Sequence, residues 1–210
     1  MNSSQAPTSN GSIESTPPLS ARQWISSVAL VAVCGAIMGL AAKRFDNTPV
    51  IGEIGTHLGV WVFTVSLIAA FSRTPLQAAL LVPLFLGAML AAYYVYSMAL
   101  FGFFPRRELL YWAGIAAASP VGAWIVWHGR GKGWVAALCA SLPVALLVVE
   151  GYPAVYTRRA ALAFDLVAAI ALLGLLARSA RQMLITGACA AIVFVVLQRV
   201  DVLSRVLSGP

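Results

Sequence analysis

The spacing of the charged residues constrains this chain more than any other feature. They fall in short clusters, with long apolar stretches between the clusters. Apolar residues make up 60% of the 210 residues and charged residues only 10%, whereas an ordinary soluble domain is about a quarter charged. A water-soluble fold so poor in charge could not cover its own surface. A helix needs about 20 apolar residues to cross bilayer hydrocarbon, so the pattern predicts an all-α, polytopic transmembrane helical bundle.

We expect about seven hydrophobic segments within a single transmembrane domain over residues 21–210. The segments lie at about 24–42, 57–71, 75–100, 109–127, 134–151, 160–177 and 183–198. The second segment offers only about 14 apolar residues, which is short for a full crossing, and if it is re-entrant the bundle has about six crossings. The third is unusually long and should tilt or break near Pro83 or Gly87. In the first, Gly35 and Gly39 are spaced so that another helix can pack closely against them.

The first 20 residues differ in composition from the rest of the chain. They are rich in Ser, Thr, Pro and Asn and almost free of large apolar residues. Such a segment cannot bury enough surface to offset its ordering entropy, so residues 1–20 are expected to form a disordered polar tail. A signal peptide would place its charge before the apolar run and close with a small-residue cleavage site, and this segment does not follow that pattern. It is therefore not a signal peptide, and the first crossing should stay in the mature protein.

The chain is basic, with a net charge of +7 from 14 Lys and Arg against 7 Asp and Glu. The positive residues stand singly or in pairs between apolar segments and form no stripe. Contact with anionic lipid at the membrane surface explains them more simply than nucleic acid does. Membrane lipids are therefore expected partners, nucleic acid is not, and the expected location is the cell (plasma) membrane.

The positive residues do not decide the orientation. With seven crossings one side carries Arg22, Arg73, Arg130, Lys132, Arg178 and Arg181, and the other carries Lys43, Arg44, Arg106, Arg107, Arg158, Arg159, Arg199 and Arg205. The two sets are too similar in number for the positive-inside rule to choose between them. Acidic residues also cluster on the second side, but they contribute little to this rule.

The chain lacks the motifs of soluble enzymes. It has no phosphate-binding GxxxxGK[ST] loop, no HExxH and no GxSxG. Its three cysteines are scattered among the apolar segments without a CxxC spacing or a Cys/His cluster. We therefore expect no enzyme activity, no catalytic residues, no metal site and no cofactor.

Three ionisable side chains fall inside or at the ends of apolar segments: His57, Glu150 and Asp165. A charged group at the bilayer centre costs at least about 2.5–3.5 kcal/mol on insertion scales, so each needs a reason to be there. Glu150 and Asp165 belong to hairpin neighbours, so they could face one cavity as a cation- or amine-binding pair or a proton relay. In the alternative interpretation, Glu150 lies in water at the interface and Asp165 pairs with Arg158 or Arg159. Both interpretations stay open, and the deeper Asp165 is the better functional candidate.

Aromatic residues near His57 suggest a pocket. His57 opens the second segment, where an imidazole serves as a ligand contact or proton carrier, or else as an interfacial or capping residue. Trp61 falls one turn later on the same helix face. Tyr93 and Tyr94 would add walls and hydroxyl groups, and small-molecule pockets combine aromatic side chains with a few polar groups. An aromatic belt at the membrane interface would explain the same tyrosines without a ligand.

Several short runs also carry a family resemblance. At HLGVWVF, AYYVYSMALFGFFP, ASPVGAWIVW and the closing acid of VVEG, over about residues 25–152, the chain resembles a family of small bacterial integral-membrane proteins with no assigned function. The matching positions are His57, Gly59, Trp61, Tyr93, Tyr94, Ser119, Pro120 and Glu150. The resemblance implies a membrane protein and carries no activity. The chain is also similar, in size and segment count, to the small substrate-capture subunits of vitamin importers. Those have six crossings and Ala-containing coupling motifs that are missing here.

Two hypotheses about function remain. The first is a protein that binds or transports a small molecule in an intramembrane pocket. Its candidate ligand-binding residues are His57, Trp61, Tyr93, Tyr94, Glu150 and Asp165. It predicts that these residues converge from at least three segments. The alternative is a non-transporting membrane scaffold, regulator or assembly partner, in which the same residues point to different surfaces. A homo-oligomer and a complex with a membrane partner protein are both compatible with the sequence.

Overall fold

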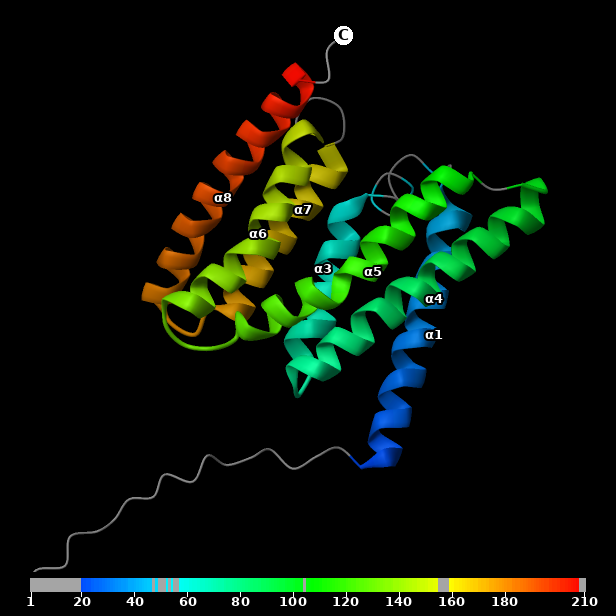
Figure 1. Cartoon of the computed structure of the whole chain (residues 1–210), viewed down its shortest axis with the longest axis horizontal. Helices are drawn as coiled ribbons and strands as arrows, with labels where there is room; N and C mark the ends of the chain where they lie inside the picture. The colour runs from blue at the N-terminus through cyan, green and yellow to red at the C-terminus, as the bar shows by residue number, and fades with distance from the viewer. Residues whose placement is uncertain are drawn as a thin grey trace, which may run out of the picture.

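The structure is a computed structural model. It describes residues 20–46, 48, 52, 54, 57–103, 105–154 and 159–207, and for residues 150–154, 159, 197 and 200–207 it describes the backbone only. Within these ranges the chain forms seven α-helices and no strand (Figure 1). They are α1 (Ala21–Phe45), α3 (Leu58–Phe71), α4 (Pro75–Phe101), α5 (Arg106–His128), α6 (Trp134–Ala154), α7 (Arg159–Leu176) and α8 (Ala180–Leu207).

The all-α prediction is confirmed, and each helix coincides with one predicted hydrophobic segment. The third segment was expected to tilt or break, and α4 shows no break because it runs through Pro83 and Gly87, so the tilt stays a prediction. Neighbouring helices can re-satisfy the backbone groups that a proline frees in an apolar bundle, and α4 packs against α1, α3 and α5. The predicted disordered tail lies outside the described residues, apart from Ser20.

Local sequence signals explain where several helices begin and end. Ser20 caps α1, since its hydroxyl accepts a hydrogen bond from the backbone N–H of Gln23 and the Gln23 side chain accepts one from the backbone N–H of Ser20. Thr74 caps α4 through its hydroxyl, which accepts a hydrogen bond from the backbone N–H of Gln77, and Pro75 is the first helical residue. Gly102 ends α4 with a φ of 71°, in the left-handed region that glycine adopts without strain.

The helices form two groups with α3 between them (Figure 1). In the N-terminal group α4 packs against both α1 and α5, and in the C-terminal group α6 packs against both α7 and α8. The short α3 contacts α4, α5, α6 and α7. Its Trp61 belongs to the apolar core of the N-terminal group, whereas Val62, Phe63 and Leu67 pack against the core of the C-terminal group. Helix α3 is therefore the central element of the bundle.

Two glycines allow the close packing of α1 on α4. Gly35 and Gly39 are buried on one face of α1. A Cβ atom at Gly35 would collide with the backbone carbonyl of Phe85, and one at Gly39 would collide with the carbonyl of Met89. The predicted role of this small-residue spacing in helix packing is confirmed, because only a missing side chain lets the two backbones approach this closely.

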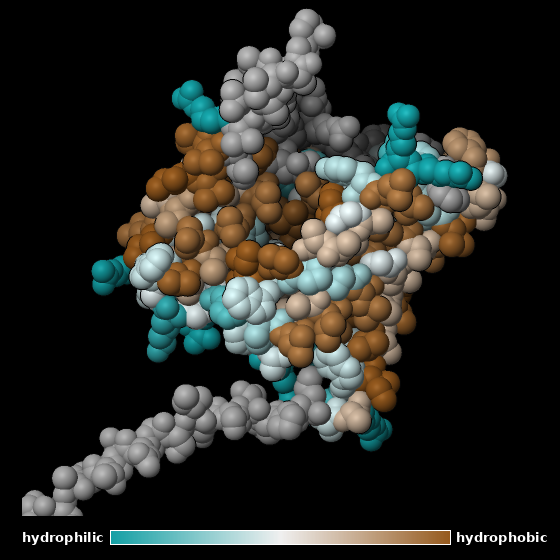
Figure 2. All heavy atoms as spheres, viewed as in Figure 1, coloured by the Kyte–Doolittle hydropathy of each residue, from teal (hydrophilic) through white to brown (hydrophobic). Residues whose placement is uncertain are grey.

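The outer surface of the bundle is apolar. Each of the seven helices exposes large hydrophobic side chains, for example Leu30 of α1, Val121 of α5 and Leu184 of α8. Figure 2 shows apolar side chains across the visible face, with the strongly hydrophilic ones toward its margins. Among the described residues, α1, α4 and α5 are long and apolar enough to cross a membrane. The other helices contain shorter apolar stretches, namely Leu58–Phe71, Trp134–Val149, Ala160–Leu176 and Ala180–Val196. The protein is therefore membrane-associated, because so much exposed apolar surface would aggregate in water.

Candidate functional site

His57 and Asp165 form a buried pair that joins α3 to α7. His57 occupies the N-cap position of α3, but its side chain makes no capping hydrogen bond. Its Nε2 lies 2.6 Å from Oδ2 of Asp165, and the relative exposures of the two residues are 7% and 1%. The sequence suggested Arg158 or Arg159 as partners of Asp165. The side chains of both lie outside the described residues, and histidine is the partner that the structure presents.

Gly59 makes room for the carboxyl group of Asp165. A Cβ atom at this position would collide with Oδ1 of Asp165, so any side chain here would displace the carboxyl group. The same Oδ1 atom is buried without a hydrogen-bond partner among the described residues. His57 and Gly59 thus hold the Asp165 carboxyl from two sides at the first turn of α3. The pair can share or exchange one proton, and it fastens the central helix to the C-terminal group.

The opposite end of α3 is fastened to the N-terminal group. The backbone carbonyl of Ser72, directly after α3, accepts hydrogen bonds from Nε1 of Trp127 at 3.0 Å and from the guanidinium of Arg130 at 2.7 Å. Trp127 is in the last turn of α5, and Arg130 follows that helix. Because its two ends are tied to different groups, α3 links the two halves of the bundle along its whole length.

A small cavity of about 130 Å³ lies next to the N-terminal part of α3. It collects side chains from α1, α3, α4 and α5, namely Ala42, Trp61, Met89, Leu90, Tyr93, Tyr94, Glu108 and Trp112. The rings of Tyr93 and Tyr94 meet edge to face, with their centroids 5.2 Å apart. The hydroxyl of Tyr93 also lies 3.4 Å from Asp46, which pairs with Lys43 at 3.0 Å. This end of the cavity is therefore polar, with hydroxyl and carboxylate groups in its wall.

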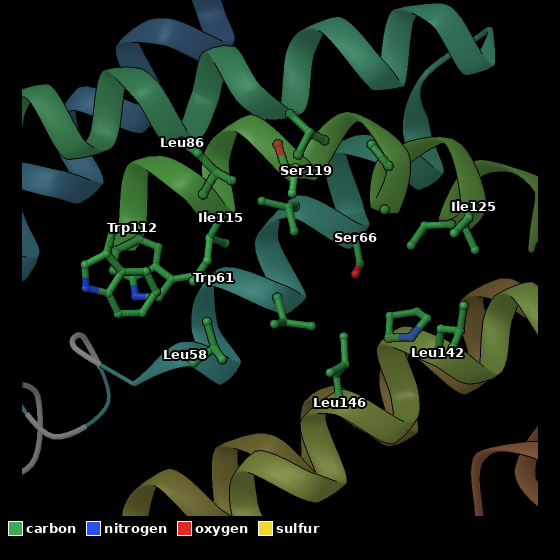
Figure 3. A pocket seen from close by; sticks show the side chains of 18 of the residues that line it. Leu58, Trp61, Ser66, Leu86, Trp112, Ile115, Ser119, Ile125, Leu142 and Leu146 are labelled. Carbon is green, nitrogen blue, oxygen red and sulfur yellow. The ribbon is translucent and has the colours of Figure 1, made fainter. Parts of the chain in front are cut away.

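A second and larger cavity, of about 460 Å³, lies between the two helix groups. Its wall comes from α3, α4, α5, α6 and α8 and is almost entirely apolar. Figure 3 shows Trp61 and Trp112 at one end of this cavity, and Ile125 and Leu142 at the other. Apart from the indole nitrogens, the polar side chains in its wall are Ser66 and Ser119. The hydroxyl of Ser119 already donates to the carbonyl of Ala116 at 2.7 Å, so it offers little to a ligand.

The two cavities adjoin each other. Trp61, Met89, Leu90 and Trp112 line both of them. An apolar cavity therefore lies beside a smaller, more polar one, whose wall includes Tyr93, Tyr94 and Glu108. The volume of the larger one is within the range of about 300–1,000 Å³ that is typical of small-molecule pockets.

The structure does not bring the six predicted pocket residues together in one pocket. His57 and Asp165 form the buried pair, and Trp61, Tyr93 and Tyr94 line the small cavity. Trp61 connects the two places, since it follows His57 by one turn of α3. The backbone of Glu150 lies in α6, but its side chain falls outside the described residues.

Sequence reasoning missed Glu108, Trp112 and the large apolar cavity. Glu108 directly precedes the predicted segment at about 109–127, so it was not among the ionisable residues considered for a site. The available signal was the spacing of Glu108 and Trp112, which places them on one face of α5. The large cavity has no local sequence signal, because it results from how α5 and α6 diverge around α3.

Comparison with known proteins gives no relative from which a function could be carried over. No family model, no curated protein and no solved structure matches the chain. The resemblance to small bacterial membrane proteins thus stays a prediction, and the function has to be inferred from the geometry of the bundle.

Proposed function

We propose that the chain is a multi-pass protein of the cell membrane that binds an amphipathic small molecule inside the bundle. The apolar body of the ligand occupies the large cavity between the two helix groups. Its polar end lies past Trp61 and Trp112, near Tyr94 and Glu108. The observation that carries this proposal is the shared wall of the two cavities, because it places an apolar cavity directly beside a more polar one.

The lining of the large cavity selects for an apolar ligand. A cavity with so few polar groups offers water almost no hydrogen bonds, and apolar cavities of this kind stay dry and bind apolar molecules. A strongly polar substrate would lose its hydration there without compensation. An alkyl chain or a ring system of the ligand would instead pack against Leu86, Ile115, Leu142 and Leu146.

The small cavity selects for the head of the ligand. Glu108 brings a carboxylate, the tyrosines bring hydroxyl groups, and the two indole rings bring faces that attract cations. A head that donates hydrogen bonds, such as an amine, meets acceptors here. Carboxylate or phosphate heads are disfavoured by Glu108.

Seven crossings are part of the proposal. Consecutive helices run in opposite directions in Figure 1, which supports one crossing for each helix. If the protein also transports its ligand, the two helix groups would have to move relative to each other. Helix α3 would carry the strain of that motion, because His57 and Ser72 fasten its ends to different groups.

Native mass spectrometry of the gently extracted protein tests the proposal, using a matched pair of glycine variants on α5. Gly122 lines the large cavity and Gly114 does not, and a Cβ atom at either position meets nothing within 4 Å. Gly122→Leu should therefore fill the cavity and abolish retention of the small molecule, whereas Gly114→Leu should retain it.

Equal retention in both variants would refute a ligand in this cavity. Retention of only bulk lipid or of a second polypeptide, in the wild type and both variants alike, would instead favour the scaffold hypothesis.

A further inference from the structure

A third cavity lies among the helix ends farthest from Tyr93 and Glu108. It has a volume of about 460 Å³ and sits where the α5–α6 and α7–α8 connections meet. Its lining residues are Lys132, Gly133, Trp134, Arg178, Ser179, Arg181, Gln182 and Ile185. Figure 1 shows the two connections close together at the same end of the bundle.

Hydrogen bonds of Gln182 connect the segments that form this cavity. The buried side chain of Gln182 donates through Nε2 to the carbonyl of Gly131 at 3.2 Å, which ties the start of α8 to the α5–α6 connection. Its Oε1 accepts from the backbone N–H of Arg178 at 3.2 Å, and its own N–H donates to the hydroxyl of Ser179. These hydrogen bonds hold the backbones of the two connections together around one space, which the exposed side chains of Lys132, Arg178 and Arg181 line.

The charges around this cavity have one sign. Lys132, Arg178 and Arg181 line it, and no acidic residue does. Among the residues whose side chains the structure describes, the acidic ones lie elsewhere in the fold. Asp46 follows the end of α1, Glu108 is in the first turn of α5 and Asp165 is in the N-terminal half of α7. All of these are at the opposite end of the bundle from the α5–α6 and α7–α8 connections.

We infer that this cavity binds a phosphate group. Guanidinium groups match phosphate oxygens with paired, charge-assisted hydrogen bonds, and the lysine adds a point charge. Phospholipid headgroups and free phosphate share this chemistry. The surroundings favour a phospholipid, because Trp134 is 71% exposed beside the cavity and Ile185 is part of its wall. An indole at the membrane interface packs against the upper part of an acyl chain while the phosphate lies among the cations.

Native mass spectrometry with three probes tests this inference: phosphatidylglycerol, phosphatidylcholine and inorganic phosphate. The test variant is the double substitution Arg178→Gln with Arg181→Gln. The matched control is Arg22→Gln with Arg73→Gln, which removes the same charge from the same end of the bundle but outside the cavity. All four arginines are exposed, so both variants should fold, and their thermal unfolding profiles check this.

The expected result is binding of phosphatidylglycerol that is about tenfold weaker in the test variant and unchanged in the control. If added inorganic phosphate does not reduce the binding of phosphatidylglycerol to the wild type, the site takes a lipid headgroup. The site takes free phosphate if inorganic phosphate binds the wild type but not the test variant, while phosphatidylglycerol binds both proteins equally well. If phosphatidylglycerol binding is weakened equally in both variants, the lipid is attracted by diffuse surface charge. If its binding is weakened in neither variant, the cavity is not a binding site. Either of these two results overturns the inference.

Discussion

Nε2 of His57 lies 2.6 Å from Oδ2 of Asp165, although the two residues are 108 positions apart in the chain. This contact fixes the first turn of α3 against α7, and the next turn of α3 carries Trp61 into the wall shared by the two cavities. The placement of the candidate ligand site therefore depends on a polar pair that does not line either cavity itself.

Removing one member of this pair should destabilise the bundle. Asp165→Ala leaves His57 buried without this partner, and breaking a buried pair typically costs about 3–5 kcal/mol. His57→Ala should cost a similar amount. The double variant should cost less than the sum of the two single variants, with a coupling of about 0.5–3 kcal/mol, because the two side chains contact each other. The free energy of unfolding of all three variants is measured in mixed micelles with increasing SDS. If the losses of the two single variants add exactly in the double variant, the contact is absent.

Gly59→Ala should also destabilise the protein, by about 1–3 kcal/mol, because the new methyl group displaces the Asp165 carboxyl group. Gly174→Ala on α7 is the control. Its Cβ atom meets nothing within 4 Å, so the substitution should be neutral or slightly stabilising. A Gly59→Ala variant as stable as this control would contradict the close approach of Asp165 to α3.

Gly39→Ala should weaken the packing of α1 on α4. Here the new methyl group meets the backbone carbonyl of Met89, which cannot rotate away as a side chain would. We expect a loss of about 1–3 kcal/mol in the same SDS titration. Gly114→Ala, on the open face of α5, should show no loss. Equal stability of the two variants would mean that α1 does not dock on α4 through this face.

Glu108→Gln should weaken ligand binding without affecting the fold. Glu108 is exposed at its helix surface and lines the small cavity. The amide keeps the size of the side chain but removes its charge, so an amine head should bind about tenfold more weakly and an uncharged head about equally well. Native mass spectrometry of ligand retention gives the comparison. Unchanged retention of an amphipathic amine would place its head elsewhere.

The helices could be predicted from the sequence because their signals are local. Apolar runs predict the segments, which the structure confirms as helices, and Gly102, Pro105 and Gly133 mark the end of α4 and the starts of α5 and α6. Of the two outcomes expected for the long third segment, a tilt or a break, the break does not occur at Pro83, because packing by neighbouring helices outweighs the local cost of one proline.

The candidate site was less accessible to prediction because its contacts are not local. Asp165 was recognised as a residue that needs a partner, but hairpin neighbours suggested Glu150 or the nearby arginines. Its actual partner is on α3, which reaches α7 only because α3 lies between the two helix groups. Trp61 and Trp112 likewise line the same two cavities through the packing of α3 beside α5, which no sequence pattern specifies.

The most direct test of ligand binding between the helix groups is photolabelling. The wild type would be irradiated with an alkylamine that carries a diazirine in its chain, and the labelled residues would be mapped by peptide mass spectrometry. We predict that the labels concentrate on inward-facing residues of α3, α5 and α6, such as Val65, Ser119 and Leu146, and that Gly122→Leu removes them. Labels confined to outward-facing residues such as Val121 and Ile170, unchanged in Gly122→Leu, would show that the amine only dissolves in the surrounding lipid and would contradict the proposed function.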